Sequence, residues 1–136
     1  MIVDATCMYL TLKPSTFDVM LLPNLYGSIM GSVVAGLVGG PGIAPGCNVG
    51  ENHIMFEQGA RHPAKDLVKD KKGNPTAFIL ASAKMLNHLW LENFGKAIND
   101  AVYEVIKEGK VRTFDIGGHH WMDEFTTEVL SKIWLA

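Results

Sequence analysis

NLYGSIMGSVVAGLVGGPG, residues 24–42, is the stretch that decides the fold of this chain. It lies within residues 19–50, a span without a single charged side chain. Asn24 could cap a helix, and apolar residues then recur every four positions along one helical face, at Leu25, Ile29, Val33 and Leu37. Glycines and prolines interrupt the span too often for a membrane helix, which needs ~18 to 20 apolar residues. We therefore predict a buried helix followed by a glycine-rich loop over residues 39–50.

Before this stretch, the sequence predicts a helix and a strand. Asp4 is a candidate N-cap for a short helix that ends before Pro14. Residues 17–22 form an almost continuously apolar run closed by Pro23, as in a strand covered on both faces. Beyond the loop, residues 54–56 predict another strand. The mixed charges of residues 65–72 favour a solvated face over a phosphate-binding patch.

Three helices follow in the C-terminal half. The first begins with Asn74 as N-cap and Pro75 at its first position, and runs towards Trp90. The second ends at Gly109 and carries one apolar face, made of Phe94, Ile98, Ala101 and Val105. The third starts near Asp123, and its apolar stripe comprises Phe125, Val129 and Ile133. Many helices with few strands predict a single α/β domain over residues 1–136, helix-rich with an incomplete sheet, as in one portion of a larger domain.

Composition excludes several classes of function. The chain has 136 residues and a formal net charge of −2, so no overall positive field favours nucleic acid or an anionic membrane. Cys7 and Cys47 cannot form a disulfide framework, so a reducing compartment and buried thiols are expected. The first residues show no targeting pattern.

Two local motifs suggest a functional site, but neither matches the pattern that such a site requires. Residues 40–45, GPGIAP, suggest a dinucleotide loop, but Pro45 occupies the third glycine position and a helix precedes the motif. His119 and His120 with Asp123 suggest a metal site. Adjacent histidines on a loop usually point apart, however, and no further ligand set accompanies them.

The chain nevertheless resembles the isocitrate and isopropylmalate dehydrogenases, the β-decarboxylating family. The matching motifs run through the sequence: Asn24-Leu25-Tyr26-Gly27, residues 35–42, Phe56-Glu57, Asn74-Pro75-Thr76-Ala77, residues 85–89 and Asp115-Ile116-Gly117-Gly118. Residues 59–63 and 109–113 resemble most closely the β-type, non-catalytic subunits of mitochondrial NAD-dependent enzymes. The resemblance implies the C-terminal portion of that fold and a place in the mitochondrial matrix.

Departures from the family pattern bear on function. Catalytic members carry aspartates where this chain has Ser28 and Ser32, and two aspartates four apart on a helix form one pincer for Mg²⁺ or Mn²⁺. By resemblance, that metal polarises the substrate and stabilises the enolate left by decarboxylation. Asp4 matches a third metal-binding aspartate, one that reaches into the neighbouring subunit's site. The pincer is lost while the donated ligand remains.

The nucleotide-binding pattern is also altered. Asn74 matches an asparagine that contacts the adenine in family members. Residues 60–64, ARHPA, replace the His-Gly-Thr-Ala-Pro stretch that wraps the nucleotide. The family's N-terminal half, with its catalytic tyrosine and lysine, has no counterpart here, so we expect no activity from this chain alone.

The resemblance thus implies a regulatory subunit of NAD-dependent isocitrate dehydrogenase, with Mg²⁺ or Mn²⁺ and NAD bound at the active site of a catalytic partner subunit. An alternative is a binding or scaffold protein derived from the family. A third possibility, an active dehydrogenase, conflicts with Ser28 and Ser32.

Overall fold

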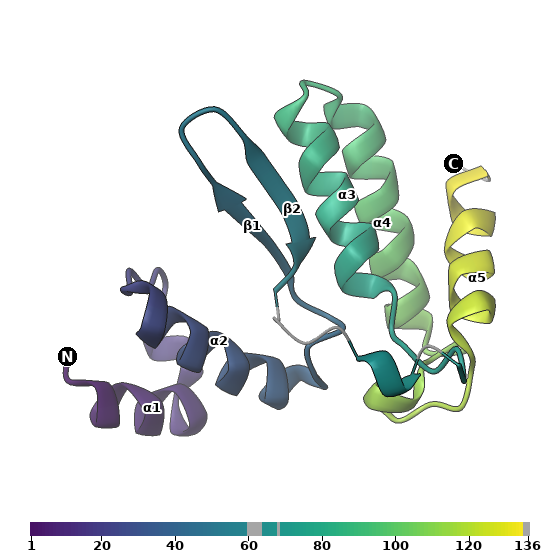
Figure 1. Ribbon diagram of the computed structural model, residues 1–136. Coiled ribbons are helices and arrows are strands. Elements are labelled where there is room, and N and C mark those ends of the chain that lie inside the picture. The colour runs from purple at the N-terminus through teal and green to yellow at the C-terminus, as the bar shows by residue number, and fades with distance from the viewer. Residues whose placement is uncertain (60–63, 68, 135–136) are drawn as a thin grey trace.

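The computed structural model describes residues 1–59, 64–67 and 69–134, arranged as three neighbouring parts (Figure 1). The first part pairs two helices, α1 (Val3–Leu12) and α2 (Asn24–Val38). A hairpin follows, with strands β1 (Pro45–Val49) and β2 (Ile54–Gln58). The third part holds α3 (Thr76–His88), α4 (Glu92–Glu108) and α5 (Met122–Trp134). Short 3-10 turns lie between them: η1 (Pro14–Thr16), η2 (Lys65–Leu67) and η3 (Phe114–Ile116).

The hydrophobic core lies between α3, α4 and α5. Its most deeply buried members include Phe125 and Val102, each with no exposed surface, and Val105 and Val129. These residues recur three and four positions apart, so they share one face of each helix. Gly109 ends α4 in the left-handed conformation, at a φ of 67°, where glycine carries no steric penalty. The predicted stripes of α4 and α5 are confirmed, except that Phe94 is exposed.

The sheet consists of two antiparallel strands that pack against α3. Its register pairs Pro45 with Gln58 and Val49 with Ile54. The strand predicted at residues 54–56 is confirmed. The prediction of a loop up to Gly50 is wrong from Pro45 onward, because β2 supplies hydrogen-bond partners to a segment whose own composition disfavours a strand.

The strand predicted over residues 17–22 is wrong. This segment has no strand pairing in the described part of the chain, and its side chains reach solvent, with Val19 at 86% and Leu21 at 97% exposure. An apolar run becomes a strand only when a neighbouring strand satisfies its backbone groups. The segment lacks that neighbour here.

Helix starts differ by one or two residues from expectation. Ile2 and Pro23, not Asp4 and Asn24, occupy the N-cap positions of α1 and α2, and neither caps through its side chain. Asp4 lies in the first turn of α1, where its Oδ1 accepts a hydrogen bond from the Ala5 N–H at 2.7 Å. Asn74 precedes α3 by two residues, yet its side chain still accepts from the Thr76 N–H.

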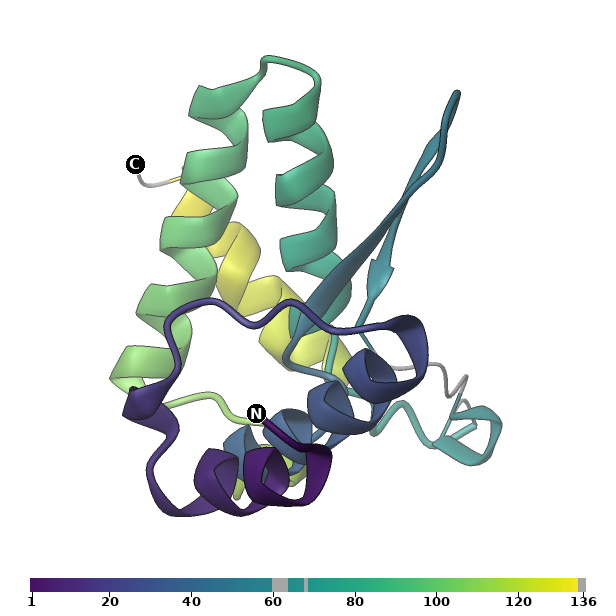
Figure 2. The ribbon, with the colours of Figure 1, turned by 90° about the vertical axis from the view of Figure 1, so that its left-hand side faces the viewer.

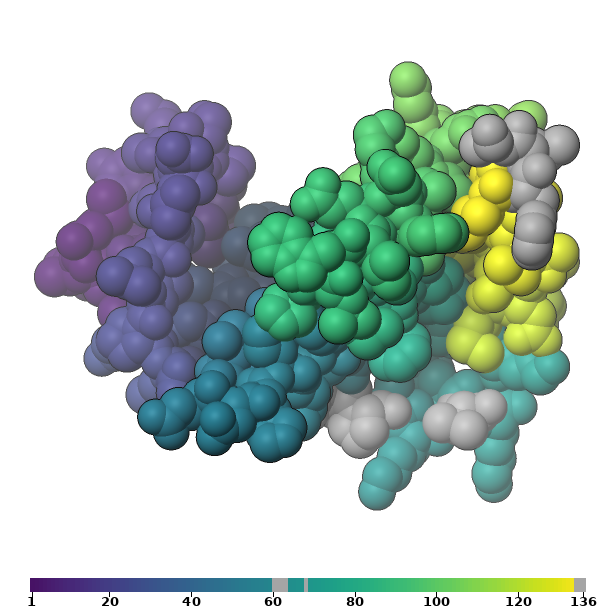
Figure 3. Space-filling view, turned by 90° about the horizontal axis from the view of Figure 1, so that it is seen from above, coloured from purple at the N-terminus to yellow at the C-terminus, as the bar shows by residue number. Residues whose placement is uncertain are grey.

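The helix pair α1–α2 stands apart from α3, α4 and α5. Within the pair, the Cys7 thiol lies 3.8 Å from the Met30 sulfur. Neither helix packs extensively on the three C-terminal helices in the described residues. Seen from above, the surface is hollowed between the two parts (Figure 3). Among the described residues, no helix combines the length and apolar character needed to cross a membrane.

Candidate functional site

The outer face of α2 carries the residues on which the functional interpretation depends. Ser28 and Ser32 are exposed one turn apart, and with their apolar neighbours they line a shallow hollow, made of Leu25, Ser28, Ile29, Ser32 and Val33. The Ser32 hydroxyl donates to the Ser28 carbonyl oxygen at 2.9 Å. A serine hydroxyl bonded to the preceding turn is a common arrangement in helices. This face therefore presents neutral hydroxyls among apolar side chains.

The residues on this face do not fit a divalent cation. Mg²⁺ and Mn²⁺ prefer carboxylate oxygens, and neither serine supplies one. Asp4 is exposed on α1, and one of its oxygens already accepts the Ala5 N–H. No group of three or more His, Cys, Asp or Glu side chains within the described ranges could hold a metal.

Asn74 lies at a junction of three segments. Its Nδ2 donates to Asp115 Oδ2 at 2.9 Å, and its Oδ1 accepts from the Thr76 N–H at 3.0 Å. The other oxygen of Asp115 accepts a bond from the buried Thr113 hydroxyl. Both ends of the Asn74 amide are thus engaged within the chain. Four of the five residues expected to wrap a nucleotide, 60–63, lie outside the described residues.

The contact between Asn74 and Asp115 was missed from the sequence. Forty-one positions separate the two residues, so neither periodicity nor capping rules connect them. Their only shared signal is that each belongs to a family motif.

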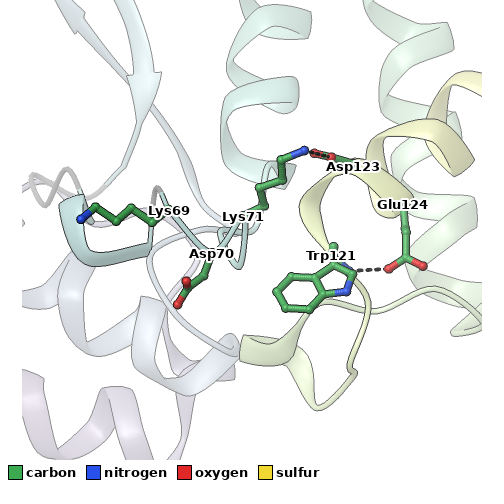
Figure 4. A pocket seen from close by; sticks show the side chains of 6 residues that line it. All are labelled: Lys69, Asp70, Lys71, Trp121, Asp123 and Glu124. Carbon is green, nitrogen blue, oxygen red and sulfur yellow. Dashed lines mark hydrogen bonds and ion pairs between the residues drawn. The ribbon is translucent and has the colours of Figure 1, made fainter.

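A second hollow lies where the segment before α3 meets the start of α5 (Figure 4). It is lined by Lys69, Asp70, Lys71, Trp121, Asp123 and Glu124. Lys71 forms an ion pair with Asp123 at 2.6 Å, and this carboxylate raises the pKa of the lysine. Glu124 accepts the Trp121 backbone N–H at 2.7 Å, and the Lys71 carbonyl accepts the Met122 N–H at 3.0 Å.

The two bonds of Lys71 join the segment before α3 to the start of α5, and Lys71, Asp123 and Glu124 are engaged around the hollow. Asp70, the remaining acid, lies 3.7 Å from the Lys72 ammonium group. The prediction of a solvated face over residues 65–72 is confirmed for the described ones, which are exposed or half-buried.

His119 and His120 do not point apart, so that expectation is wrong. Their rings stack with centroids 5.1 Å apart, because the turn brings the His120 N–H onto the Arg112 carbonyl oxygen at 3.0 Å. Asp123 pairs with Lys71 instead of with either histidine. Cys47 is exposed on β1, contrary to the expected burial, while Cys7 is half-buried.

Comparison with known proteins places these features in a family. The sequence model described as isocitrate/isopropylmalate dehydrogenase matches residues 1–133. The chain belongs to the isocitrate/isopropylmalate dehydrogenase family. It is 47% identical over 135 residues to a regulatory subunit of mitochondrial isocitrate dehydrogenase (NAD) from Arabidopsis thaliana, a match that covers 97% of this chain and 37% of that protein. It is 46% identical over 133 residues to the human beta subunit of mitochondrial isocitrate dehydrogenase (NAD), covering 98% of this chain and 34% of that protein.

The fold of this family member also matches solved structures. The crystal structure of isocitrate dehydrogenase from Methylococcus capsulatus superposes with a TM-score of 0.92 at 33% identity, over 98% of this chain and 40% of that one. The predicted fold class and the resemblance to β-type, regulatory subunits are confirmed. The chain spans about a third of the length of the curated relatives it matches.

Proposed function

We propose that this family member is a regulatory, non-catalytic subunit of a mitochondrial NAD-dependent isocitrate dehydrogenase. It would support a catalytic partner subunit that oxidises isocitrate to 2-oxoglutarate and CO₂ in the tricarboxylic acid cycle. The names of relatives at 46% and 47% identity support this role and a place in the mitochondrial matrix. Mg²⁺ or Mn²⁺ and NAD would bind at the partner's active site.

The observation that carries the proposal is the neutral Ser28/Ser32 face of α2. Decarboxylation of a β-keto acid leaves an enolate, and a divalent cation stabilises the developing negative charge. Two serine hydroxyls, one of them bonded to its own helix, cannot replace the anionic oxygens that hold such a cation. The chemistry would therefore depend on carboxylates of the partner.

The same helix offers a surface for the partner. The apolar stripe expected to be buried is largely open, with Leu25 at 67%, Ile29 at 43% and Leu37 at 54% exposure. The exposed Val19 and Leu21 lie in the segment that leads into this helix. Exposed apolar surface of this kind marks protein interfaces, and the span of residues 19–50 supplies no charged side chain to cover it. We expect the chain to self-associate when it is expressed alone.

Co-expression of this chain with the catalytic subunit of an NAD-dependent isocitrate dehydrogenase tests the proposal. The two should co-purify as a defined complex, and Ile29→Glu should abolish the association, because it buries a charge in the interface. Leu130→Glu is the matched control, since Leu130 is similarly exposed, at 49%, but lies on α5. Failure to co-purify, or equal loss in both variants, would contradict the proposal. Stable association with another protein instead would favour a scaffold role.

A further inference from the structure

We infer that the loop at residues 39–44 couples the partner-facing α2 to the junction of Asn74 and Asp115, so that partner binding tightens the start of α3. The inference rests on the proposed function, because it takes α2 as the docking surface. It adds a path by which docking would reach the C-terminal helices. The path consists of backbone and side-chain contacts within this chain.

A movement of α2 would reach the C-terminal helices through this loop. The helix pair α1–α2 makes no extensive packing contact with α3, α4 or α5 in the described ranges. Figure 2 shows the pair below α3, α4 and the hairpin, and Figure 1 shows the chain passing from the end of α2 to the hairpin through the loop. The first turns of α2 share a hollow with the hairpin but do not pack extensively on it, so a shift of α2 reaches α3 mainly where the loop touches its neighbours.

The loop also packs closely against Asn74 and against Ile116, which follows Asp115. A Cβ added at Gly42 would stand 2.8 Å from the Asn74 Cβ, and the Gly42 carbonyl oxygen accepts the Ala77 N–H at 2.7 Å. A Cβ added at Gly39 would stand 2.9 Å from Ile116 and 3.5 Å from the Asp115 carbonyl oxygen. The loop thus leaves no room for a side chain between Gly42 and Asn74, or between Gly39 and Ile116, the residue after Asp115.

The hydrogen bonds of Asn74 and Asp115 would pass a displacement of the loop on to the start of α3. One carboxylate oxygen of Asp115 accepts a hydrogen bond from the Asn74 amide, and the other accepts one from the buried Thr113 hydroxyl. The Asn74 side-chain oxygen in turn accepts a hydrogen bond from the Thr76 N–H in the first turn of α3. Thr76 and Ala77 are buried, at 0% and 1% exposure, so movement there displaces the core end of α3. Close-packed interiors pass on small shifts because they contain little free volume.

Glycine is required at two positions in this loop, Gly39 and Gly42, for different reasons. Gly39 has a φ of 125°, which other residues rarely adopt, so the helix can end there and turn sharply. Gly42 is required by the close approach of Asn74. Substitution at Gly42 therefore disturbs the contact without placing anything on the outer face of α2.

The test follows the amide exchange of Ala77, which reports directly on the bond to Gly42. In this chain co-purified with the catalytic subunit, exchange at Ala77 should be about tenfold slower than in the chain alone, a coupling of ordinary size. Gly42→Ala should remove that slowing while the complex still forms. Gly73→Ala is the matched control, because a Cβ there meets nothing within 4 Å and residue 73 lies outside α2, and it should behave as wild type.

Asp115→Ala provides a second variant that removes a contact without adding bulk, and it should also remove the slowing. Co-purification without slower exchange at Ala77 in the wild-type chain overturns the coupling alone. Retention of the full slowing in Asp115→Ala overturns it as well. Failure to co-purify overturns the proposed function, and the coupling with it.

Discussion

Ser32 donates its hydroxyl hydrogen to the carbonyl oxygen of Ser28, one helical turn earlier, at 2.9 Å. The two side chains stand where a metal-binding pair would need two carboxylates on one helical face. One hydroxyl is turned back onto the helix, and neither carries charge. The local geometry of α2 is thus ordinary for a helix, and its exposed face is apolar and neutral, as the proposed docking role requires.

The isolated chain should therefore show no isocitrate oxidation. Neither NAD nor NADP should be reduced in the presence of isocitrate with Mg²⁺ or Mn²⁺, because no pair of carboxylates replaces Ser28 and Ser32. Nucleotide absorbance over time measures this, with heat-killed protein as the control. Metal-dependent reduction above that control would disprove the expectation.

The contact between α4 and α5 should be sensitive to acid through Glu108. Hydrogen bonds from Lys132, and then from Lys110, lower the pKa of this carboxyl below its ordinary value of 4.5. Because the folded-state pKa is the lower one, the stabilisation is fully present above pH 4.5 and is lost as the pH falls through the folded-state value. Thermal melting at a series of pH values should show this loss.

Glu108→Gln should flatten that acid dependence. Glu128→Gln, on α5, is the matched control, because Glu128 makes no ion pair in the described part of the chain. An unchanged acid profile in Glu108→Gln would show that other carboxyl groups dominate.

Trp90 should be a site where substitution stabilises the protein. It follows α3 with a φ of 62°, its N–H donates to Asn87, and the next N–H, of Leu91, donates to Leu86. This arrangement ends a helix with a left-handed residue, a position that favours glycine or asparagine. The tryptophan side chain is 86% exposed, so its removal sacrifices little packing.

Trp90→Asn should raise the free energy of unfolding by about 1 kcal/mol, the order of the left-handed penalty. The urea midpoint, followed by circular dichroism, measures it. Trp90→Ala is the control, because alanine keeps the strained backbone and should give little gain. Equal stabilisation by both variants would show that the effect comes from removing the exposed ring and not from relieving the backbone strain.

The parts of the fold that sequence predicted are those whose causes are local. Helix α5 was found because Phe125 and Val129 repeat at helical spacing and meet neighbours supplied by the next helices. The strand expected at residues 17–22 failed because a strand depends on a partner that periodicity does not reveal. The stripe of α2 was interpreted correctly as apolar and wrongly as buried, since burial depends on what covers it.

The residues of the candidate site also differ in whether the sequence could identify them. Ser28 and Ser32 could be singled out because a resemblance assigns meaning to their positions. The bond between Asn74 and Asp115 could not, because it depends on how η3 folds back onto the start of α3. The exposure of Cys47 likewise could not be predicted, because it depends on how far other elements cover the two-stranded sheet.

Asp4 provides the sharpest test of the proposed role, in a version of this subunit extended to the length of its relatives and assembled with its catalytic partner. If Asp4 is donated to the partner's metal, Asp4→Asn removes one anionic oxygen while keeping the size of the side chain. Apparent affinity for Mn²⁺ and the rate should both fall, and excess Mn²⁺ should restore part of the rate.

A purely structural role for Asp4 makes the opposite prediction. The structure places it in the first turn of α1, accepting the Ala5 N–H at 2.7 Å. Asparagine can accept that bond equally well, so only the favourable interaction with the helix dipole, about 0.3–1 kcal/mol, would be lost. Asp4→Ala would lose the bond as well and destabilise the helix further. Metal dependence that is unchanged in Asp4→Asn, with a small fall in melting temperature, would therefore leave Asp4 as a stabiliser of α1 and remove it from the partner's site.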